Sequence, residues 1–268
     1  MKGFLVTCTG AILYVSLLFS SFQTLGQDTT RGPSFSAGVD LMSRYIWRGT
    51  DYGNAPGIQP NLALTWKGFE LGVWGSYGFG KYSTKINDST IIENGNYAEF
   101  DPYLSYTARY FSICFTDYFF PNSLNPNLNN KYFNYKSGNT GHLLEGMLCL
   151  QGPAKFPLKL MAATMFYGND KKQKISGTDT SMVSNYSTYL ELSYPFNVKS
   201  VDATIFLGAT PGKGIYMMDG SDGFQVVNLG LTVSKTIPIT EKFGLPVSAS
   251  IITNPQAESV FLVFGISL

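Results

Sequence analysis

Apolar and polar positions alternate along residues 58–79, in two arms separated by the dipeptide Lys67-Gly68. A period of two predicts β-strands, because successive side chains of a strand point to opposite faces. The two-residue turn predicts that the arms pair as an antiparallel hairpin. Each arm is about ten residues long, which is the length of a tilted strand that crosses a bilayer.

The same alternation recurs along the rest of the chain and predicts about twelve strands. They lie near residues 34–46, 58–66, 69–79, 97–108, 110–120, 141–151, 157–168, 184–194, 198–209, 224–235, 245–253 and 258–268. Connections after the even strands are short, and those after the odd strands are mostly long and polar. This sorting is typical of outer-membrane barrels, which have tight periplasmic turns and long extracellular loops. The predicted fold class is therefore all-β, a single antiparallel up-and-down transmembrane β-barrel.

Charged and aliphatic residues fall on opposite faces of these strands. Leu64, Leu71 and Leu192 exemplify the face expected to meet lipid, where a charge costs about 2–4 kcal/mol at mid-bilayer. The opposite face is expected to line the lumen. Its predicted charged residues are Asp40, Arg44, Arg48, Glu70, Glu99, Asp101, Glu145, Lys159, Glu191 and Asp202.

Aromatic residues gather near the predicted turns and loops. Tyr45, Trp47 and Tyr118 flank long connections and are expected in an aromatic belt at the outer membrane surface. The alternative is that the aromatic residues form the core of a soluble β-sandwich.

The composition favours the membrane alternative. Charged residues make up 14% of the 268 residues, against roughly 25% in a typical soluble domain. The net charge of +1 gives no electrostatic reason to expect a nucleic-acid partner. After residue 27 no apolar run approaches the length of a transmembrane helix.

The N-terminus resembles a secretory signal. Lys2 is followed by a largely apolar stretch and then by Thr24-Leu25-Gly26, a small-residue cleavage site. We predict a signal peptide over residues 1–26, an outer-membrane β-barrel domain over residues 27–268, and localisation to the cell outer membrane. The alternative for this stretch is an uncleaved membrane anchor.

One region carries a family resemblance. Ser43-Arg44-Tyr45-Ile46-Trp47-Arg48-Gly49, followed by Pro56, Gln59 and residues 68–76, resembles the opening of the TorF-like porin family. The resemblance covers residues 36–79 and implies a barrel of Gram-negative outer membranes with porin activity. The last strand, Val260–Leu268, fits a signal for the barrel-assembly machinery, although it ends in leucine where phenylalanine is commoner.

The motif suggests a role for its two arginines. We expect Arg48 at the outer rim and Arg44 below it, both facing Glu99 and Asp101. Such an arrangement makes a transverse field across a pore. The equally favoured alternative is a salt-bridge network that fills the lumen. Twelve strands lie between filled eight-stranded barrels and open sixteen-stranded ones, so any pore is narrow.

The predicted function is passive diffusion of small solutes, with a weak preference for cations because acids outnumber bases in the predicted lumen. The alternative is a closed barrel that serves as a structural anchor or as a surface receptor through its extracellular loops. Outer-membrane lipid and lipopolysaccharide are the expected surroundings. Lys171-Lys172-Gln173-Lys174 is expected to be a solvated loop tip, with contact to lipopolysaccharide phosphate as the alternative.

Other candidate chemistry is sparse. Cys114 and Cys149 lie on neighbouring strands and share the inward face, which makes them a candidate disulfide unless register separates them. No catalytic residue is predicted, since the one histidine, His142, has no serine beside it. No cofactor or zinc site is expected. Residues 219–223 are either a turn or a calcium loop.

Overall fold

The computed structural model describes residues 32–268, apart from 88–89, 122–130, 137–138, 177–178 and 218–221. The predicted signal peptide, residues 1–26, therefore lies outside the described residues. Within the described ranges, no helix is long and apolar enough to cross a membrane.

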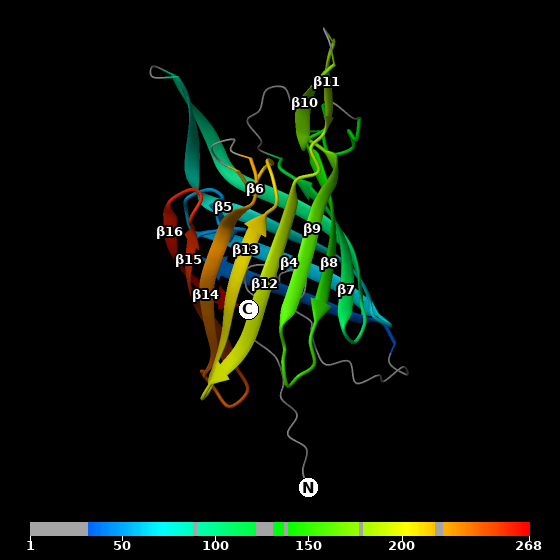
Figure 1. The fold of residues 1–268 in the computed structure, drawn as a ribbon. Coiled ribbons are helices and arrows are strands. Elements are labelled where there is room, and N and C mark those ends of the chain that lie inside the picture. The colour runs from blue at the N-terminus through cyan, green and yellow to red at the C-terminus, as the bar shows by residue number, and fades with distance from the viewer. Residues whose placement is uncertain (1–31, 88–89, 122–130, 137–138, 177–178, 218–221) are drawn as a thin grey trace.

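Twelve strands of the described chain close into a barrel in which chain neighbours pair antiparallel (Figure 1). This confirms the predicted twelve-stranded antiparallel fold. The wall consists of β1 (Ser34–Met42), β4 (Gly57–Trp66), β5 (Phe69–Asn87), β6 (Thr90–Thr107), β7 (Phe111–Phe119), β8 (His142–Gln151), β9 (Lys159–Gly168), β12 (Thr188–Val198), β13 (Val201–Thr210), β14 (Gln225–Pro238), β15 (Gly244–Asn254) and β16 (Ser259–Ser267).

The connections sort by length as predicted. The short-turn end of the barrel carries the β4–β5, β6–β7, β8–β9, β12–β13 and β14–β15 turns, and the long-loop end carries the other connections. Some predicted boundaries were wrong. The expected loop at 80–96 is largely strand, because β5 and β6 continue past the wall as a projecting hairpin (Figure 1). The expected turn at 195–197 lies within β12, and the chain turns instead at Lys199, whose φ is 56°.

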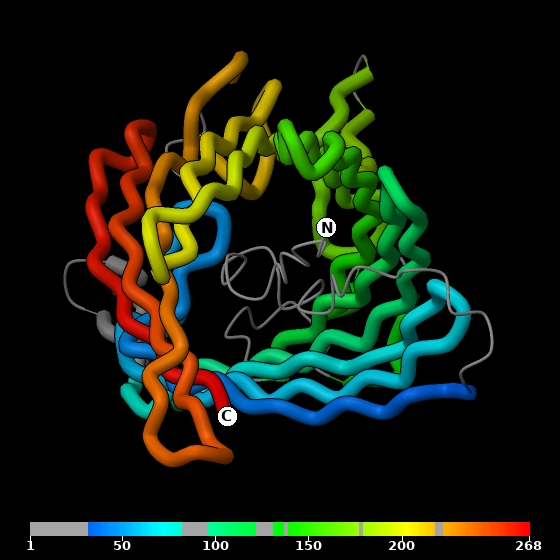
Figure 2. The backbone as a smooth tube through the Cα atoms, turned by 90° about the horizontal axis from the view of Figure 1, so that it is seen from below, coloured from blue at the N-terminus to red at the C-terminus, as the bar shows by residue number. Residues whose placement is uncertain are grey.

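Two small hairpins interrupt the long connections. β10 (Lys171–Ser176) pairs with β11 (Asp179–Ser184) and projects from the long-loop end (Figure 1). β2 (Ile46–Trp47) pairs with β3 (Thr50–Asp51) and folds inside the ring of strands, where Figure 2 shows it as the blue loop. The first wall strand therefore ends at Met42, and the prediction that it continues to residue 46 was wrong.

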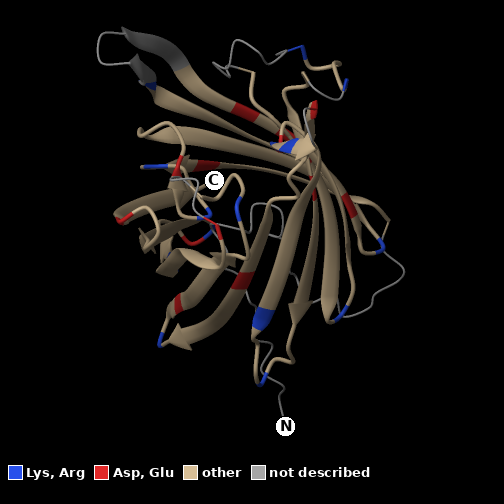
Figure 3. Ribbon diagram, turned by 45° about the horizontal axis from the view of Figure 1, so that its top comes forward, with Lys and Arg blue, Asp and Glu red and all other residues tan. Residues whose placement is uncertain are grey.

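Burial alternates along the wall, as predicted from the separation of charged and aliphatic residues onto opposite faces of the strands. In β7 every second residue from Ser112 to Tyr118 is buried, and the residues between are exposed or half-buried. In β5, Leu71 is 60% exposed, whereas its neighbour Glu70 is 9% exposed. The wall strands carry few charged residues (Figure 3). An aliphatic exterior over a polar interior is the arrangement of strands that face lipid.

The barrel closes through a short seam. β1 and β16 share three register pairs, from Asp40↔Ser267 to Met42↔Gly265. The backbone of Leu268 extends the seam by exchanging hydrogen bonds of 2.9 and 3.0 Å with Val39. Leu268 therefore contributes directly to closure.

The exterior predicts a depth-dependent cost for charge on β12. Leu192 lies at mid-strand between Leu160 and Leu207, and Val198 lies on the same face beside the turn. We expect Leu192→Arg to lower the free energy of unfolding in lipid vesicles by about 2–4 kcal/mol, and Val198→Arg by about 0–1 kcal/mol. Urea unfolding measures both. Equal costs at the two depths would contradict a lipid-facing exterior.

Candidate functional site

The inserted hairpin turns at Arg48-Gly49. Both residues have positive φ, 50° and 81°, which is the combination of a type I′ turn. A Cβ on Gly49 would lie 1.9 Å from the carbonyl oxygen of Val227, so the close approach to β14 requires glycine. Asn254 of β15 donates a 3.2 Å hydrogen bond to the Gly49 carbonyl oxygen. These contacts seat the turn against the inner wall.

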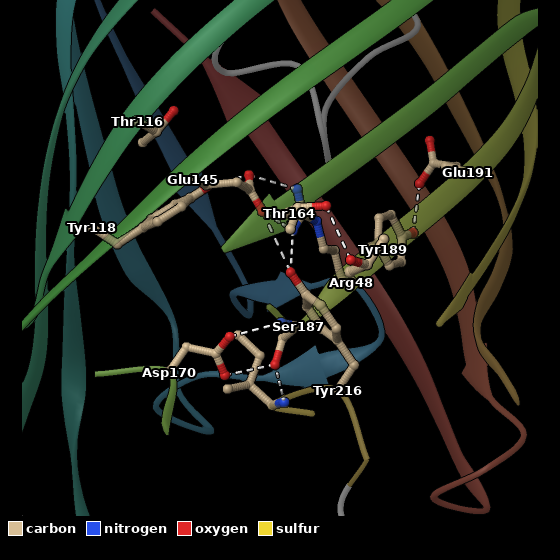
Figure 4. Close-up of polar contacts among 12 residues, drawn as sticks. Arg48, Thr116, Tyr118, Glu145, Thr164, Asp170, Ser187, Tyr189, Glu191 and Tyr216 are labelled. Carbon is tan, nitrogen blue, oxygen red and sulfur yellow. Dashed lines mark hydrogen bonds and ion pairs between the residues drawn. The ribbon is translucent and has the colours of Figure 1, made fainter. Parts of the chain in front are cut away.

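Arg48 forms a two-pronged ion pair with Glu145 of β8 (Figure 4). Its Nη1 lies 2.5 Å from Oε1 and its Nη2 lies 2.9 Å from Oε2. The two side chains are 2% and 1% exposed. Tyr118 donates a 2.9 Å hydrogen bond to Glu145 Oε2, and the Tyr216 hydroxyl accepts one from Arg48. Planar guanidinium and carboxylate groups match well in this geometry, which strengthens the pair.

Three aromatic rings surround the guanidinium carbon of Arg48. The centroids of Trp47, Tyr189 and Tyr216 lie 4.5, 4.6 and 5.5 Å from it. Cation–π attraction is strongest where the cation is removed from water, as here. The rings therefore add to the stabilisation that Glu145 provides.

A polar cluster holds Tyr216 in place. Asp170 accepts 2.7 Å hydrogen bonds from the backbone N–H and the hydroxyl of Ser187 (Figure 4). The same hydroxyl accepts a 3.0 Å hydrogen bond from the Ile215 N–H. The Ser187 oxygen is thereby engaged as donor and as acceptor, so its role is to fix the connection that carries Tyr216.

The segment 43–56 brings its own aromatic rings into the barrel. The ring centroids of Tyr45 and Trp74 are 5.2 Å apart, and those of Trp47 and Tyr118 are 5.5 Å apart. The prediction that Tyr45, Trp47 and Tyr118 belong to a surface belt was wrong. Tyr45 and Trp47 pack inside because the chain leaves the wall after Met42, and Tyr118 lies on the inward face of β7.

The predicted placement of the two arginines was also wrong. Arg48 is not at the rim, and neither arginine pairs with Glu99 or Asp101. Arg44 donates to Asp51 within the inserted segment at 2.6 Å, and this pair is partly exposed. The contacts of Arg48 correspond instead to the alternative expectation, a salt-bridge network that fills the lumen.

Tyrosine hydroxyls donate hydrogen bonds to most of the inward-facing carboxylates. Tyr–acid hydrogen bonds link Tyr97 to Glu99, Tyr103 to Glu70, Tyr118 to Glu145 and Tyr189 to Glu191, at 2.5 to 2.9 Å. These tyrosine partners were not predicted from the sequence. The sequence did carry a signal for two pairs, Tyr97–Glu99 and Tyr189–Glu191. In each, the tyrosine precedes the glutamate by two residues on one strand, so both side chains lie on the same face.

Two of the remaining predicted lumen residues, Asp101 and Asp40, are buried, and the others are partly exposed. Asp101 is 2% exposed, accepts a hydrogen bond from the Phe119 N–H at 3.4 Å and shares another with Glu99. Two carboxyl groups can bond in this way only when they share a proton. Asp40 is buried, while Lys159 and Asp202 are half-buried.

The candidate disulfide between Cys114 and Cys149 is not formed, and both are buried free thiols. Register is the reason. Cys114 stands opposite Met147, and Cys149 stands opposite Ser112. A diagonal offset of two residues separates α-carbons by about 7–8 Å, which exceeds the usual reach of a disulfide.

The described residues contain no group of three or more His, Cys, Asp or Glu side chains that could hold a metal ion. Most of the candidate calcium loop, residues 219–221, lies outside the described residues. At its described edge, the backbone N–H groups of Lys213 and Gly223 hold the pKa of Asp222 below its usual range.

Comparisons with known proteins yield one family. The model of a family described as "Bacterial protein of unknown function (Gcw_chp)" matches residues 26–232. No curated protein matches the chain. A solved structure described as "Salmonella typhi OmpF complex with Daunomycin" aligns with 88% of this chain and 97% of that chain, at 9% identity and a TM-score of 0.35. A likeness this distant does not bear on the fold or function of the chain.

The buried ion pair predicts an asymmetric response to mutation. Arg48→Met or Glu145→Gln leaves one charged partner buried and alone, so we expect each to lower the free energy of unfolding by about 3–5 kcal/mol. The double variant should lose less than the sum of the two. Arg44→Met, which breaks the partly exposed pair with Asp51, is the control and should cost about 1 kcal/mol or less. Additive losses at Arg48 and Glu145 would show that they do not interact.

Proposed function

The chain belongs to the Gcw_chp family of bacterial proteins of unknown function, and we propose that it is a narrow porin of the outer membrane whose lumen is constricted by the inserted hairpin. Small solutes pass when the segment 43–56 moves away from the wall. The observation that carries this proposal is the Arg48–Glu145 pair, which joins the hairpin to β8 inside the barrel.

Membrane insertion is supported by the two faces of the wall. The exposed face of the strands is dominated by leucine, isoleucine and phenylalanine, and the inner face carries the carboxylates and hydroxyls. A soluble barrel of this size has no reason to expose so large an apolar band. Outer-membrane lipid and lipopolysaccharide are the surroundings that this band fits.

A passage for polar solutes is supported by the interior. Serine, threonine and asparagine side chains continue along the inner wall of the later strands, among them Thr204, Asn228, Thr232, Ser248 and Ser250. Hydroxyls and amides can exchange hydrogen bonds with water or a solute as it passes.

A second candidate function is a permanently closed barrel that acts as an anchor or receptor. It is favoured by the same ion pair, because side chains 2% and 1% exposed leave no water-filled path between them. The long-loop end, with its projecting hairpins β5–β6 and β10–β11, would then be the surface that meets partners (Figure 1).

Gly49→Ala separates the two functions. A methyl group at this position would collide with the Val227 carbonyl and would strain a residue at φ 81°, so the hairpin could no longer seat. We expect larger or more frequent openings than in the native protein in planar lipid bilayers, with the lumen charges unchanged.

Gly223→Ala is the matched control. It carries a similar backbone strain, at φ 96°, but has nothing within 4 Å of the added methyl. Native conductance is expected for this variant. If neither the native protein nor Gly49→Ala conducts ions, the result would favour the closed barrel over the porin.

Lumen charge predicts the ion preference. With Glu145 paired to Arg48 and Arg44 paired to Asp51, the remaining predicted lumen acids are opposed by one remaining base, Lys159. We therefore expect a reversal potential that favours cations under a salt gradient, reduced in Glu191→Gln and increased in Lys159→Gln. Anion preference in the native protein would contradict the assignment of these side chains to the conducting path.

A further inference from the structure

The chain has a single histidine, His142, which begins β8 at the long-loop end and is fully buried. Its Nδ1 lies 2.7 Å from Asp117 Oδ1 on β7. Its Nε2 lies 2.5 Å from the carbonyl oxygen of Tyr132, in the connection between β7 and β8. The rings of Phe119 and Tyr135 stack on the imidazole, with centroids 4.7 and 4.0 Å away.

Both ring nitrogens face groups that accept hydrogen bonds. A carbonyl oxygen and an ionised carboxylate have no hydrogen to donate, and a neutral imidazole carries only one N–H. The imidazolium form carries two and satisfies both partners. If Asp117 held the proton instead, the cluster would still contain one proton more than neutral His142 with ionised Asp117. Full burial removes water as a substitute partner for either nitrogen.

The other titratable groups around the cluster are tyrosines, one further acid and two bases. The Tyr135 hydroxyl donates a 2.6 Å hydrogen bond to Asp117 Oδ2, and burial together with Asp117 raises the pKa of Tyr135, so this hydroxyl keeps its proton. Asp101 of β6 lies beyond Phe119 and adds a second acid. Tyr167 of β9 donates to the Tyr135 carbonyl at 2.5 Å. The bases of the described loop are Lys131 and Lys136.

The histidine ties the connecting segment to the barrel. Tyr132 and Tyr135 both belong to residues 131–136, and each touches His142 directly. Thr140 adds a link, because its hydroxyl donates to the Asn134 carbonyl at 2.6 Å and accepts from the His142 N–H at 3.2 Å. Loss of the Nε2 proton would remove the direct hydrogen bond between the ring and this segment.

We propose that His142 is a pH-sensitive latch that holds residues 131–136 against the barrel while it is protonated and releases them when the proton is lost. The docked arrangement binds one more proton than the released one, so docking is favoured at low pH and weakens as pH rises. The latch is independent of whether the lumen conducts.

The single histidine makes a direct test feasible. The native chain, produced with ¹⁵N-histidine and without a histidine tag, gives one imidazole to observe by NMR in lipid nanodiscs. We expect both ring nitrogens in the protonated state at about pH 5 and one of them deprotonated at about pH 9. A neutral imidazole at the acid end would overturn the proposal.

Segment release is read out by a spin label at Lys136→Cys, an exposed position, with Cys114 and Cys149 replaced by alanine. We expect the immobilised component of the spectrum to predominate at about pH 5 and to be largely lost at about pH 9. A spectrum that does not change between these conditions would overturn the proposal.

Two variants separate the latch from ordinary packing. His142→Gln should leave the label mobile at both pH values. The two N–H groups of glutamine lie on one nitrogen, whereas the two acceptors face different nitrogens of the imidazole, and glutamine does not titrate. Tyr135→Phe keeps the ring and the imidazolium but removes the hydroxyl bond to Asp117, so it should loosen the segment and retain the pH dependence. A pH response that persists in His142→Gln would assign the titration to another group and refute the latch.

Discussion

The ion pair between Arg48 and Glu145 holds the inserted hairpin against β8 inside the barrel. A barrel of twelve strands is too wide to be filled by the wall's own side chains alone and too narrow to leave a wide channel. Here the inserted hairpin supplies the missing volume, and its guanidinium can be buried because a carboxylate, a tyrosine hydroxyl and aromatic rings replace its hydration. The pair therefore anchors the segment 43–56 inside the barrel, and in the proposed porin it would also set how open the lumen is.

Other inward-facing carboxylates are likewise hydrogen-bonded to neighbouring side chains. Carboxylates on β5, β6, β8 and β12 each accept a hydrogen bond from a tyrosine, and the outer face of the same strands is aliphatic. Groups that are paired with neighbours on the wall do not depend on water in the lumen. The tyrosine bonds of Glu70, Glu99 and Glu191 therefore do not depend on the hairpin, whereas Glu145 also depends on Arg48.

The strands could be predicted from the sequence because a period of two is a local signal and because lipid strongly disfavours charge on one face. The inserted hairpin was not predicted from the sequence. Alternation ends at Leu41-Met42, but a break in alternation does not show that the chain leaves the wall. A signal was nevertheless present. Trp47-Arg48-Gly49 repeats the pattern of Trp66-Lys67-Gly68, and in both turns the base lies over the preceding tryptophan ring, at 4.5 and 4.8 Å. The residue opposite Cys114 depends on strand register, and the partners of His142 depend on how the preceding loop folds back, neither of which a local pattern encodes.

The central claim is that the tip of the hairpin pairs with β8 inside the barrel. Solid-state NMR of the protein in lipid bilayers, with ¹⁵N-arginine and ¹³C-glutamate labels, measures the coupling between the Arg48 side-chain nitrogens and the Glu145 carboxyl carbon directly. The structure predicts a strong coupling that disappears in Glu145→Gln produced with the same labels. A native protein in which Arg48 shows no coupling to Glu145 and exchanges freely with water would place the hairpin outside the lumen and contradict this account.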